Sequence, residues 1–249
     1  AGWQWRIPLQ HRTGNGHVFC SSYLSEDEAT AVLMANLDGR PLAEPRTLKF
    51  LTGMRKLAWN RNVVAVGLSS GFLEPLESTS IHLIQTAIAR LLTFFPDQGF
   101  SAEDIDEYNR QSRFEFEKIR DFIILHYHLN QREDSAFWAR CREMSIPEGL
   151  QRRIALYRRH GRIVREANEL FAEMGWLQVM HGQNLAAEGH HPLADLISDQ
   201  EVDEYLESIR LVIRQCVEVR PRHEDFVRQV CAAGNPAPLS TTSVNRATF

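Results

Sequence analysis

Two strand-like runs open the chain. The first, from Gly2 to Gln10 (GWQWRIPLQ), is rich in Trp and Ile, and the second runs from His17 to Tyr23. Between them the residues 13–16 (TGNG) tolerate positive φ angles, so the pattern predicts a β-hairpin that turns there. Because Trp3 already lies inside the first strand, we expect the chain to begin within a fold.

Side chains two apart on a strand project to the same face, which places Trp3 and Trp5 side by side. Such a pair is usually part of a core, and the wall of an aromatic-ligand pocket is the alternative. After the hairpin, Ser25 and Glu28 form a capping-box pattern that predicts a helix ending near Leu37. Short strands are predicted at 46–50 and 57–59, and the run 62–67 suits a strand buried on both faces.

The next segment is a long loop, 68–80, followed by a helix. The apolar positions of this helix have helical spacing, and they are Ile81, Ile84, Ile88, Leu91, Leu92 and Phe95. From Ser101 onward the pattern predicts only helices, at 102–130, 134–143, 147–160, 162–180 and 199–218. We therefore expect an α/β part over residues 1–95, a mostly helical subdomain over 96–233 and a disordered tail over 234–249.

The start of the helix near Thr79 is the most informative place in the chain. The first turn of a helix carries backbone amides without intrahelical partners and the positive end of the helix dipole, so an anion can bind there. The alternative is an ordinary capped helix, in which Glu77 is only a favourable charge at the helix start.

Composition and charge restrict the partners. Hydrophobic residues make up 43% and charged residues 24%, which is typical of a soluble globular protein. The net charge of −4 and the absence of a Lys/Arg run argue against nucleic acid and anionic membrane surfaces. No stretch of 18 apolar residues is present, we expect no leader peptide, and the four cysteines form no CxxC pair. These features favour a reducing cytoplasm and no membrane partner.

Two groups of polar residues invite a functional interpretation that we do not favour. His126 and His128 are two apart, which on a helix turns them away from each other, so no metal site is predicted. The arginines between 152 and 165 are expected to form a solvated helix face balanced by Glu166, Glu169 and Glu173.

Two motifs resemble one known family. Residues 3–8 (WQWRIP) are similar to the WxWxIP signature of flavin-dependent tryptophan halogenases, and residues 67–81 (GLSSGFLEPLESTSI) resemble the flavin and halide loop of that family. The resemblance is close over residues 1–95, including 59–62 (WNRN), and looser and mainly architectural to about residue 230. It implies the C-terminal part of a flavin monooxygenase-like FAD module, followed by helices on the substrate side.

The resemblance implies a reaction and a set of roles. Members of the family use reduced FAD, O2 and chloride or bromide to halogenate tryptophan or another indole, with a flavin reductase as the source of reduced FAD. By position, Glu77 and Ser78 resemble the catalytic glutamate and the serine beside it, and Thr79 and Ser80 resemble the halide-binding residues. The remaining expected roles are flavin contact for Leu68, Gly71 and Ile81, shielding near the flavin for Trp3, Trp5, Ile7 and Pro8, and substrate stacking for Trp176.

The resemblance also implies what lies elsewhere. The family's GxGxxG fingerprint and its catalytic lysine would precede Ala1, so we expect the isolated chain to be inactive. A homodimer, as some members form, is a further expectation. Two other functions stay open, namely a helical interaction module without catalysis and a related flavin monooxygenase in which the substrate meets the flavin directly.

Overall fold

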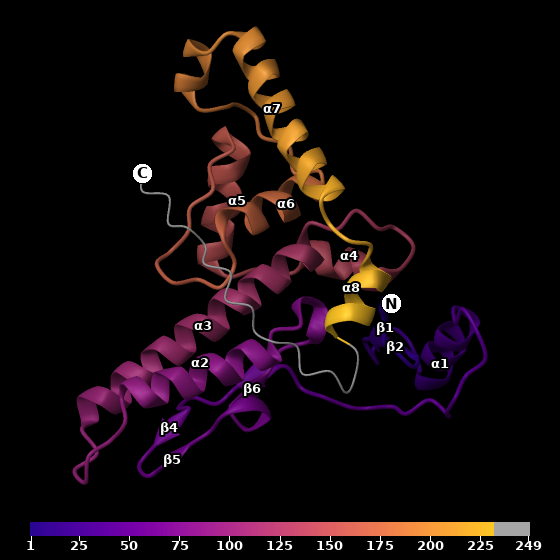
Figure 1. Ribbon diagram of the computed structural model, residues 1–249. Helices are drawn as coiled ribbons and strands as arrows, with labels where there is room; N and C mark the ends of the chain where they lie inside the picture. Colours follow the sequence, from indigo (N-terminus) through magenta and orange to yellow (C-terminus); the bar gives the residue numbers. More distant parts are fainter. Residues whose placement is uncertain (232–249) are drawn as a thin grey trace. The chain divides into compact units, whose positions relative to one another are not determined.

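The computed structural model describes residues 1–231, in which short strand pairs accompany a mostly helical chain (Figure 1). Contacts divide the chain into two compact units, Ala1–His191 and Pro192–Phe249, and each is described by itself. The strands of the described residues form three separate two-stranded antiparallel sheets. The predicted tail, 234–249, lies outside the described residues.

The predicted hairpin is confirmed, but its turn lies earlier than expected. Strand β1 (Gly2–Pro8) pairs with β2 (Thr13–Phe19), and the turn is closed by the Leu9 amide, which donates to the Arg12 carbonyl at 2.8 Å. The prediction of a turn at 13–16 was wrong because these glycines serve packing. Gly14 and Gly16 lie under the Trp5 indole, and a Cβ atom at Gly16 would overlap that ring.

The region between the hairpin and the long loop contains less regular structure than predicted. Helix α1 (Glu26–Ala35) begins at the capping box of Ser25 and Glu28, as expected. No strand forms at 46–50. The run 62–67 contributes only strand β5 (Val63–Val64), which pairs with β4 (Trp59–Asn60) around a tight turn. Val63 is 62% exposed, so the prediction of a strand buried on both faces was wrong.

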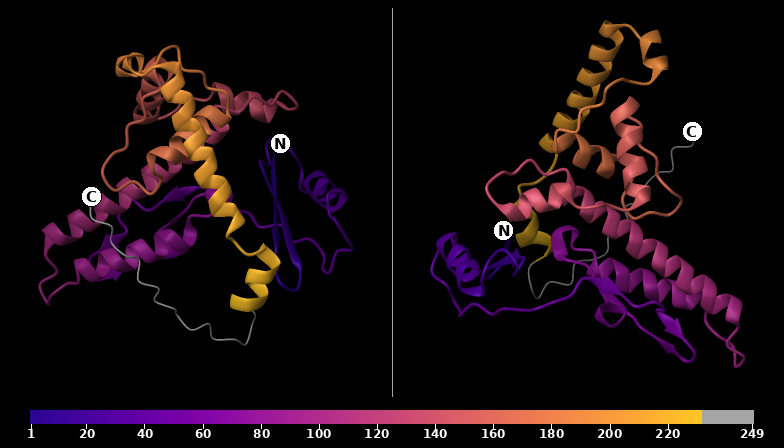
Figure 2. Two further views of the ribbon diagram at one scale, coloured as in Figure 1. Left: turned by 45° about the horizontal axis from the view of Figure 1, so that its top comes forward. Right: turned by 180° about the vertical axis from the view of Figure 1, so that it is seen from behind.

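A second small sheet carries the long loop. Strand β3 (Gly53–Met54) pairs with β6 (Gly71–Phe72), which follows the 3-10 helix η1 (Gly67–Ser69). A second 3-10 helix, η2 (Pro75–Glu77), then leads into helix α2 (Ser80–Thr93). Helix α3 (Ala102–His128) runs back along α2, and the two helices lie side by side in every view (Figures 1 and 2).

The helix predicted after the long loop is confirmed, but of the six apolar positions used to predict it only Ile84 and Leu91 are partly buried. Its buried residues are Leu83 and Ala87, whereas the side chains of Ile81, Ile88, Leu92 and Phe95 are exposed in this chain. The face toward α3 also carries polar side chains that bind Glu115 of α3. These partners in α3 compensate for the burial of polar groups, which hydrophobic periodicity alone does not register.

The remaining helices of the first unit pack on α3. They are α4 (Ala136–Glu143), α5 (Glu148–His160) and α6 (Glu173–Gly182). Helices α3, α5 and α6 contribute to a core that contains Phe122, Leu150, Ile154, Tyr157, Trp176 and Met180. The helix predicted at 162–180 begins only at Glu173. Arg153, expected on a solvated face, is buried and bonds both carboxylate oxygens of Glu169, at 3.0 and 2.5 Å.

The second unit contains the 3-10 helix η3 (Pro192–Leu196), helix α7 (Asp199–Glu218) and helix α8 (His223–Val230). The predicted bounds of α7, 199–218, are confirmed. Ser198 and Glu201 form a capping box at its start. Among residues 1–231, no helix combines the length and the apolar character needed to span a membrane.

Candidate functional site

The candidate site is built on the segment 74–80, which we call the Glu77 segment. Helix η2 ends at Glu77, Ser78 adopts the left-handed conformation (φ 51°, ψ 38°), and Thr79 is the N-cap of α2, as predicted. A non-glycine residue in this conformation costs of order 1 kcal/mol and persists only where its surroundings enforce it. Here the Ser78 amide donates to the Pro75 carbonyl at 3.0 Å, which closes the turn between the two helices.

The first turn of α2 is open toward an anion. Thr79 is buried, yet its side chain makes no capping hydrogen bond to the helix. The amides of the first turn therefore have neither an intrahelical partner nor this capping group. The side chains of Ser78 and Ser80, on either side of Thr79, are exposed. The segment thus places unpaired amides and the positive end of the helix dipole at an accessible surface.

The Glu77 carboxylate is paired with a histidine from α3. Glu77 Oε1 lies 2.9 Å from His126 Nε2, and the two side chains are 26% and 20% exposed. His126 Nδ1 lies 2.8 Å from the Phe122 carbonyl oxygen. Burial alone would lower the pKa of His126, but the Glu77 carboxylate and the Phe122 carbonyl outweigh it and hold that pKa above its ordinary value.

A second carboxylate ties the segment to the hairpin. The Trp3 indole Nε1 donates to Glu74 Oε2 at 3.2 Å and to the Tyr127 hydroxyl at 2.9 Å. Burial raises the pKa of Glu74, opposed in part by the hydrogen bonds of Trp3 and Tyr127. Burial also raises the pKa of Tyr127. Trp3 therefore fixes β1 against both the Glu77 segment and α3.

The residues expected near the flavin lie around this segment. Leu68, on η1, is 76% exposed, and Ile81, in the first turn of α2, is 70% exposed. Gly71 lies in β6, where a Cβ atom would come within 3.0 Å of the β3 backbone and of Phe116. The close pairing of these strands accounts for this glycine, and a role in flavin contact stays a prediction.

The other predicted residues divide into a hairpin group and a core residue. Trp5, Ile7 and Pro8 continue β1 beyond Trp3, with Trp5 half-buried against β2 and the other two exposed. Trp176 is only 1% exposed, with the Arg153 guanidinium 3.9 Å from its ring centroid. Phe122 contacts both Trp176 and His126 edge-on, with ring centroids 4.8 and 5.0 Å away. Trp176 is thus part of the core that supports His126.

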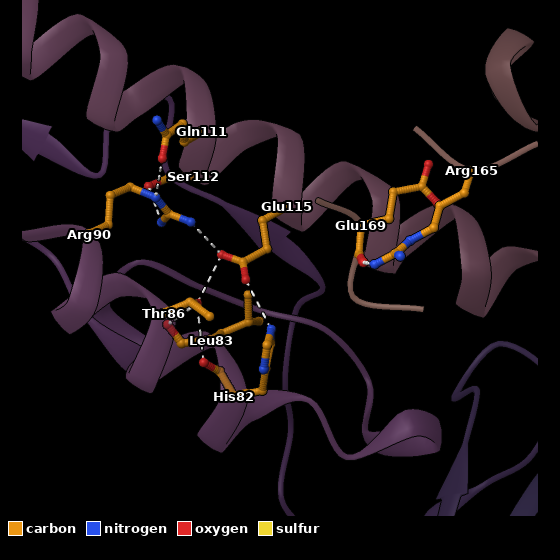
Figure 3. A network of polar contacts seen from close by, with 9 residues as sticks. All are labelled: His82, Leu83, Thr86, Arg90, Gln111, Ser112, Glu115, Arg165 and Glu169. Carbon is orange, nitrogen blue, oxygen red and sulfur yellow. Dashed lines mark hydrogen bonds and ion pairs between the residues drawn. The ribbon is translucent and has the colours of Figure 1, made fainter. Parts of the chain in front are cut away.

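A second polar centre lies between α2 and α3 (Figure 3). Glu115 Oε1 bonds His82 Nε2 at 3.0 Å, and Glu115 Oε2 accepts from Thr86 Oγ1 at 3.0 Å and from Arg90 at 2.9 Å. Arg90 also donates to Ser112 Oγ at 3.0 Å. Across residues 1–231, no group of three or more His, Cys, Asp or Glu side chains gathers in a form that could hold a metal ion.

Comparison with known proteins identifies the family. The family model described as "Tryptophan halogenase" matches residues 1–199. The chain belongs to the flavin-dependent tryptophan halogenases. Tryptophan 7-halogenase RebH from Lentzea aerocolonigenes is 31% identical over 249 residues, which cover 92% of this chain and 47% of that protein. Tryptophan 7-halogenase KtzQ from Kutzneria sp. (strain 744) is 36% identical over 159 residues, which cover 64% and 30%.

Solved halogenase structures match the fold. Xcc4156, a flavin-dependent halogenase from Xanthomonas campestris, is 52% identical with a TM-score of 0.91, and the match covers 96% of this chain and 48% of that chain. BrvH, a flavin-dependent halogenase from Brevundimonas sp. BAL3, is 49% identical with a TM-score of 0.88, covering 92% and 46%. The chain spans about half the length of these two halogenases, and its fold matches their C-terminal half.

Sequence reasoning missed the partners of the carboxylates. His126 and Tyr127 lie about 50 residues beyond Glu77 in the chain, and no spacing rule connects them with the Glu77 segment. The only feature of the sequence that bears on these residues is the spacing of His126 and His128, which places them on different sides of a helix. That spacing argued against a metal site but identified no partner for either ring.

Proposed function

We propose that this chain is the C-terminal portion of an enzyme that halogenates tryptophan or another indole with chloride or bromide, using reduced FAD and O2. The observation that carries the proposal is the Glu77 segment, where a carboxylate lies directly before a helix start with unpaired amides. Family membership supports the same reading, because the matched region, residues 1–199, contains this segment.

The residues of the segment fit the groups that the reaction requires. The open amides of the first turn of α2 fit a halide ion, which Thr79 and Ser80 would hold. Leu68 and Ile81 present exposed apolar side chains, the kind of surface that a flat ring system covers. When bound there, reduced flavin together with O2 would supply the oxidising power that makes the halogen electrophilic. A flavin reductase is then the expected source of the reduced cofactor.

Glu77 carries the second half of the proposal. Each halogen that joins an aromatic ring carbon displaces one proton from that carbon, so a carboxylate near the ring can accept that proton and balance the positive charge of the ring before the proton leaves. Glu77 has one oxygen against His126 and is otherwise available to a ligand. Ser78, strained between Glu77 and Thr79, sets the direction of both neighbours.

The substrate class follows from the relatives and stays broad. RebH and KtzQ are tryptophan 7-halogenases, at 31% and 36% identity, whereas Xcc4156 and BrvH, at 52% and 49%, are described only as flavin-dependent halogenases. We therefore propose an indole ring as the common element and free tryptophan as one candidate.

The test is halogenation by the complete gene product. Purified protein is incubated with a flavin reductase, NADH, FAD and either chloride or bromide, and indole and tryptophan are offered in separate reactions. We expect a product whose mass increases by one halogen minus one hydrogen, and none when the halide is omitted. A hydroxylated product would favour a monooxygenase, and a protein that turns over no substrate would favour the non-catalytic module.

A further inference from the structure

The environment of His126 restricts where its protons lie. Nδ1 lies 2.8 Å from the Phe122 carbonyl oxygen, which can only accept a hydrogen bond, so Nδ1 carries a hydrogen. A neutral imidazole has a single N–H group. If His126 were neutral, its bare Nε2 lone pair would face Glu77 Oε1 across 2.9 Å. A second proton between Nε2 and Oε1 removes this repulsion.

The charges around the ring indicate where that second proton belongs. Glu77 and Glu74 both act on His126 as negative neighbours from the same segment, whereas Tyr127, the next residue of α3, stays neutral because its pKa is raised. The ring is also confined, with the Phe122 side chain edge-on at 5.0 Å. One positive charge beside two carboxylates reduces their mutual repulsion, so the imidazolium with an ionised Glu77 is the favoured arrangement.

We propose that His126 is a positioning residue, which as an imidazolium anchored to the Phe122 carbonyl pairs with the Glu77 carboxylate and aims it at the start of α2. Its catalytic meaning rests on the proposed function, whereas the charge state of the pair does not. The anchor is rigid because the turn of α3 just before His126 is packed into two core clusters, through Phe122 and Leu125 in one and Ile123 in the other. The loop carboxylate thus takes its orientation from a helix.

The charge state is tested directly by NMR on this chain. Histidine is labelled with 15N, and the ring nitrogens of His126, assigned from their loss in His126→Gln, are followed from pH 5 to pH 9. We expect both ring nitrogens to be protonated at pH 6.5. In Glu77→Gln the titration midpoint should fall by about 1 pH unit, because the neighbouring charge is gone.

His82 provides a matched control in the same spectra. It also pairs with a glutamate, Glu115, at 3.0 Å. That pair lies between α2 and α3 and does not involve the Glu77 segment. The His82 ring signals should be the same in the wild type and in Glu77→Gln at each pH, which also shows that the variant is folded. A neutral His126 at pH 6.5, or a midpoint unmoved by Glu77→Gln, would overturn the proposal.

A second measurement examines the role in the complete gene product. The pH profile of kcat/KM for halogenation is compared for the wild type, His126→Gln and the control His82→Gln. We expect His126→Gln to lose about tenfold near neutral pH and to lack the alkaline decline of the wild type, and His82→Gln to keep both. If neither the wild type nor either variant halogenates a substrate, the proposed function fails while the NMR result stands. An unchanged profile in His126→Gln would refute the positioning role.

Discussion

Two glutamates of this chain each meet a histidine at nearly the same distance, and the comparison separates a structural centre from a candidate site. Glu115 has both oxygens bonded, one to His82 and the other to Thr86 and Arg90, between two packed helices (Figure 3). Glu77 meets only His126 among residues 1–231, and its second oxygen, Oε2, accepts no bond there. The same pair of side chains therefore serves different ends.

The difference lies in how much of the bonding capacity the protein itself uses. A buried carboxylate whose acceptor sites are all filled stabilises a fixed geometry and has nothing left for a ligand. A partly exposed carboxylate with an open oxygen, next to unpaired helix amides, costs stability unless a ligand or water completes it. The structural centre is therefore recognised by a carboxylate whose two oxygens both have partners within the protein, more than by the burial of that carboxylate.

The largest expected effect tests Glu77 as the functional member of the comparison. In the complete gene product, Glu77→Gln should reduce halogenation turnover by roughly 10²- to 10⁴-fold, the range for a positioned acid or base, with flavin binding unchanged. Turnover is measured with saturating substrate, and flavin binding by fluorescence titration.

Glu115→Gln serves as the matched control, since it removes the same charge from the other centre. Its turnover per folded molecule should stay near the wild type, while its melting temperature falls. Near-normal turnover in Glu77→Gln would return Glu77 to the role of a favourable charge at a helix start.

The next effect concerns stability at the saturated centre. Arg90→Met leaves Glu115 with less than its full set of partners in a nearly buried position, with side-chain exposures of 11% for Arg90 and 13% for Glu115. We expect a loss of about 3 kcal/mol in the free energy of unfolding, measured by chemical denaturation. The control, Arg152→Met, breaks the more exposed pair with Glu166 and should cost less than about 1 kcal/mol. Equal losses in the two variants would contradict the distinction.

What the sequence predicted at these two centres differs in kind. Local signals were sufficient for the N-cap at Thr79, the capping box of α1 and the bounds of α7, because each depends on residues within one turn. The partners of both carboxylates come from elements about 30 and 50 residues away, and no local rule specifies such contacts.

The errors have the same origin. The glycines at 14 and 16 were interpreted as a turn, whereas they make room for an indole from the opposite strand. Most of the apolar positions that predicted α2 are exposed, because the face that packs on α3 carries polar side chains bonded to Glu115. In both cases a tertiary partner decides the use of a residue whose local preference is ambiguous.

A smaller effect separates an anion site from a plain helix cap. Pro at residue 80 removes one amide of the first turn yet is tolerated there by a helix, so Ser80→Pro should raise the half-saturating halide concentration about tenfold or more without unfolding the protein. Thr79→Ala should change it less than twofold. Because Thr79 makes no capping bond, this variant should also cost little stability. Half-saturation by chloride and bromide, together with melting curves, measures both. Equal halide dependence in Ser80→Pro and the wild type would remove the halide assignment.

The smallest effect concerns the pH dependence of stability at Glu74. Burial raises the folded-state pKa of this carboxyl above 4.5, so the folded chain takes up its proton more readily than the unfolded chain. Stability therefore falls as the pH rises from 4.5 through the folded-state pKa.

Glu74→Gln cannot ionise and keeps an acceptor for Trp3 Nε1. Its unfolding free energy relative to the wild type should therefore increase across that pH window, by several-fold less than the Arg90→Met effect. Denaturation curves at pH 4 to 7 measure this difference, and Glu44→Gln, at an exposed position, should show none. If the unfolding free energies of Glu74→Gln and the wild type changed in parallel with pH, the Glu74 carboxylate would be as well solvated as that of Glu44. The contact of the hairpin would then leave the Glu77 segment open to water on the side of Glu74 too.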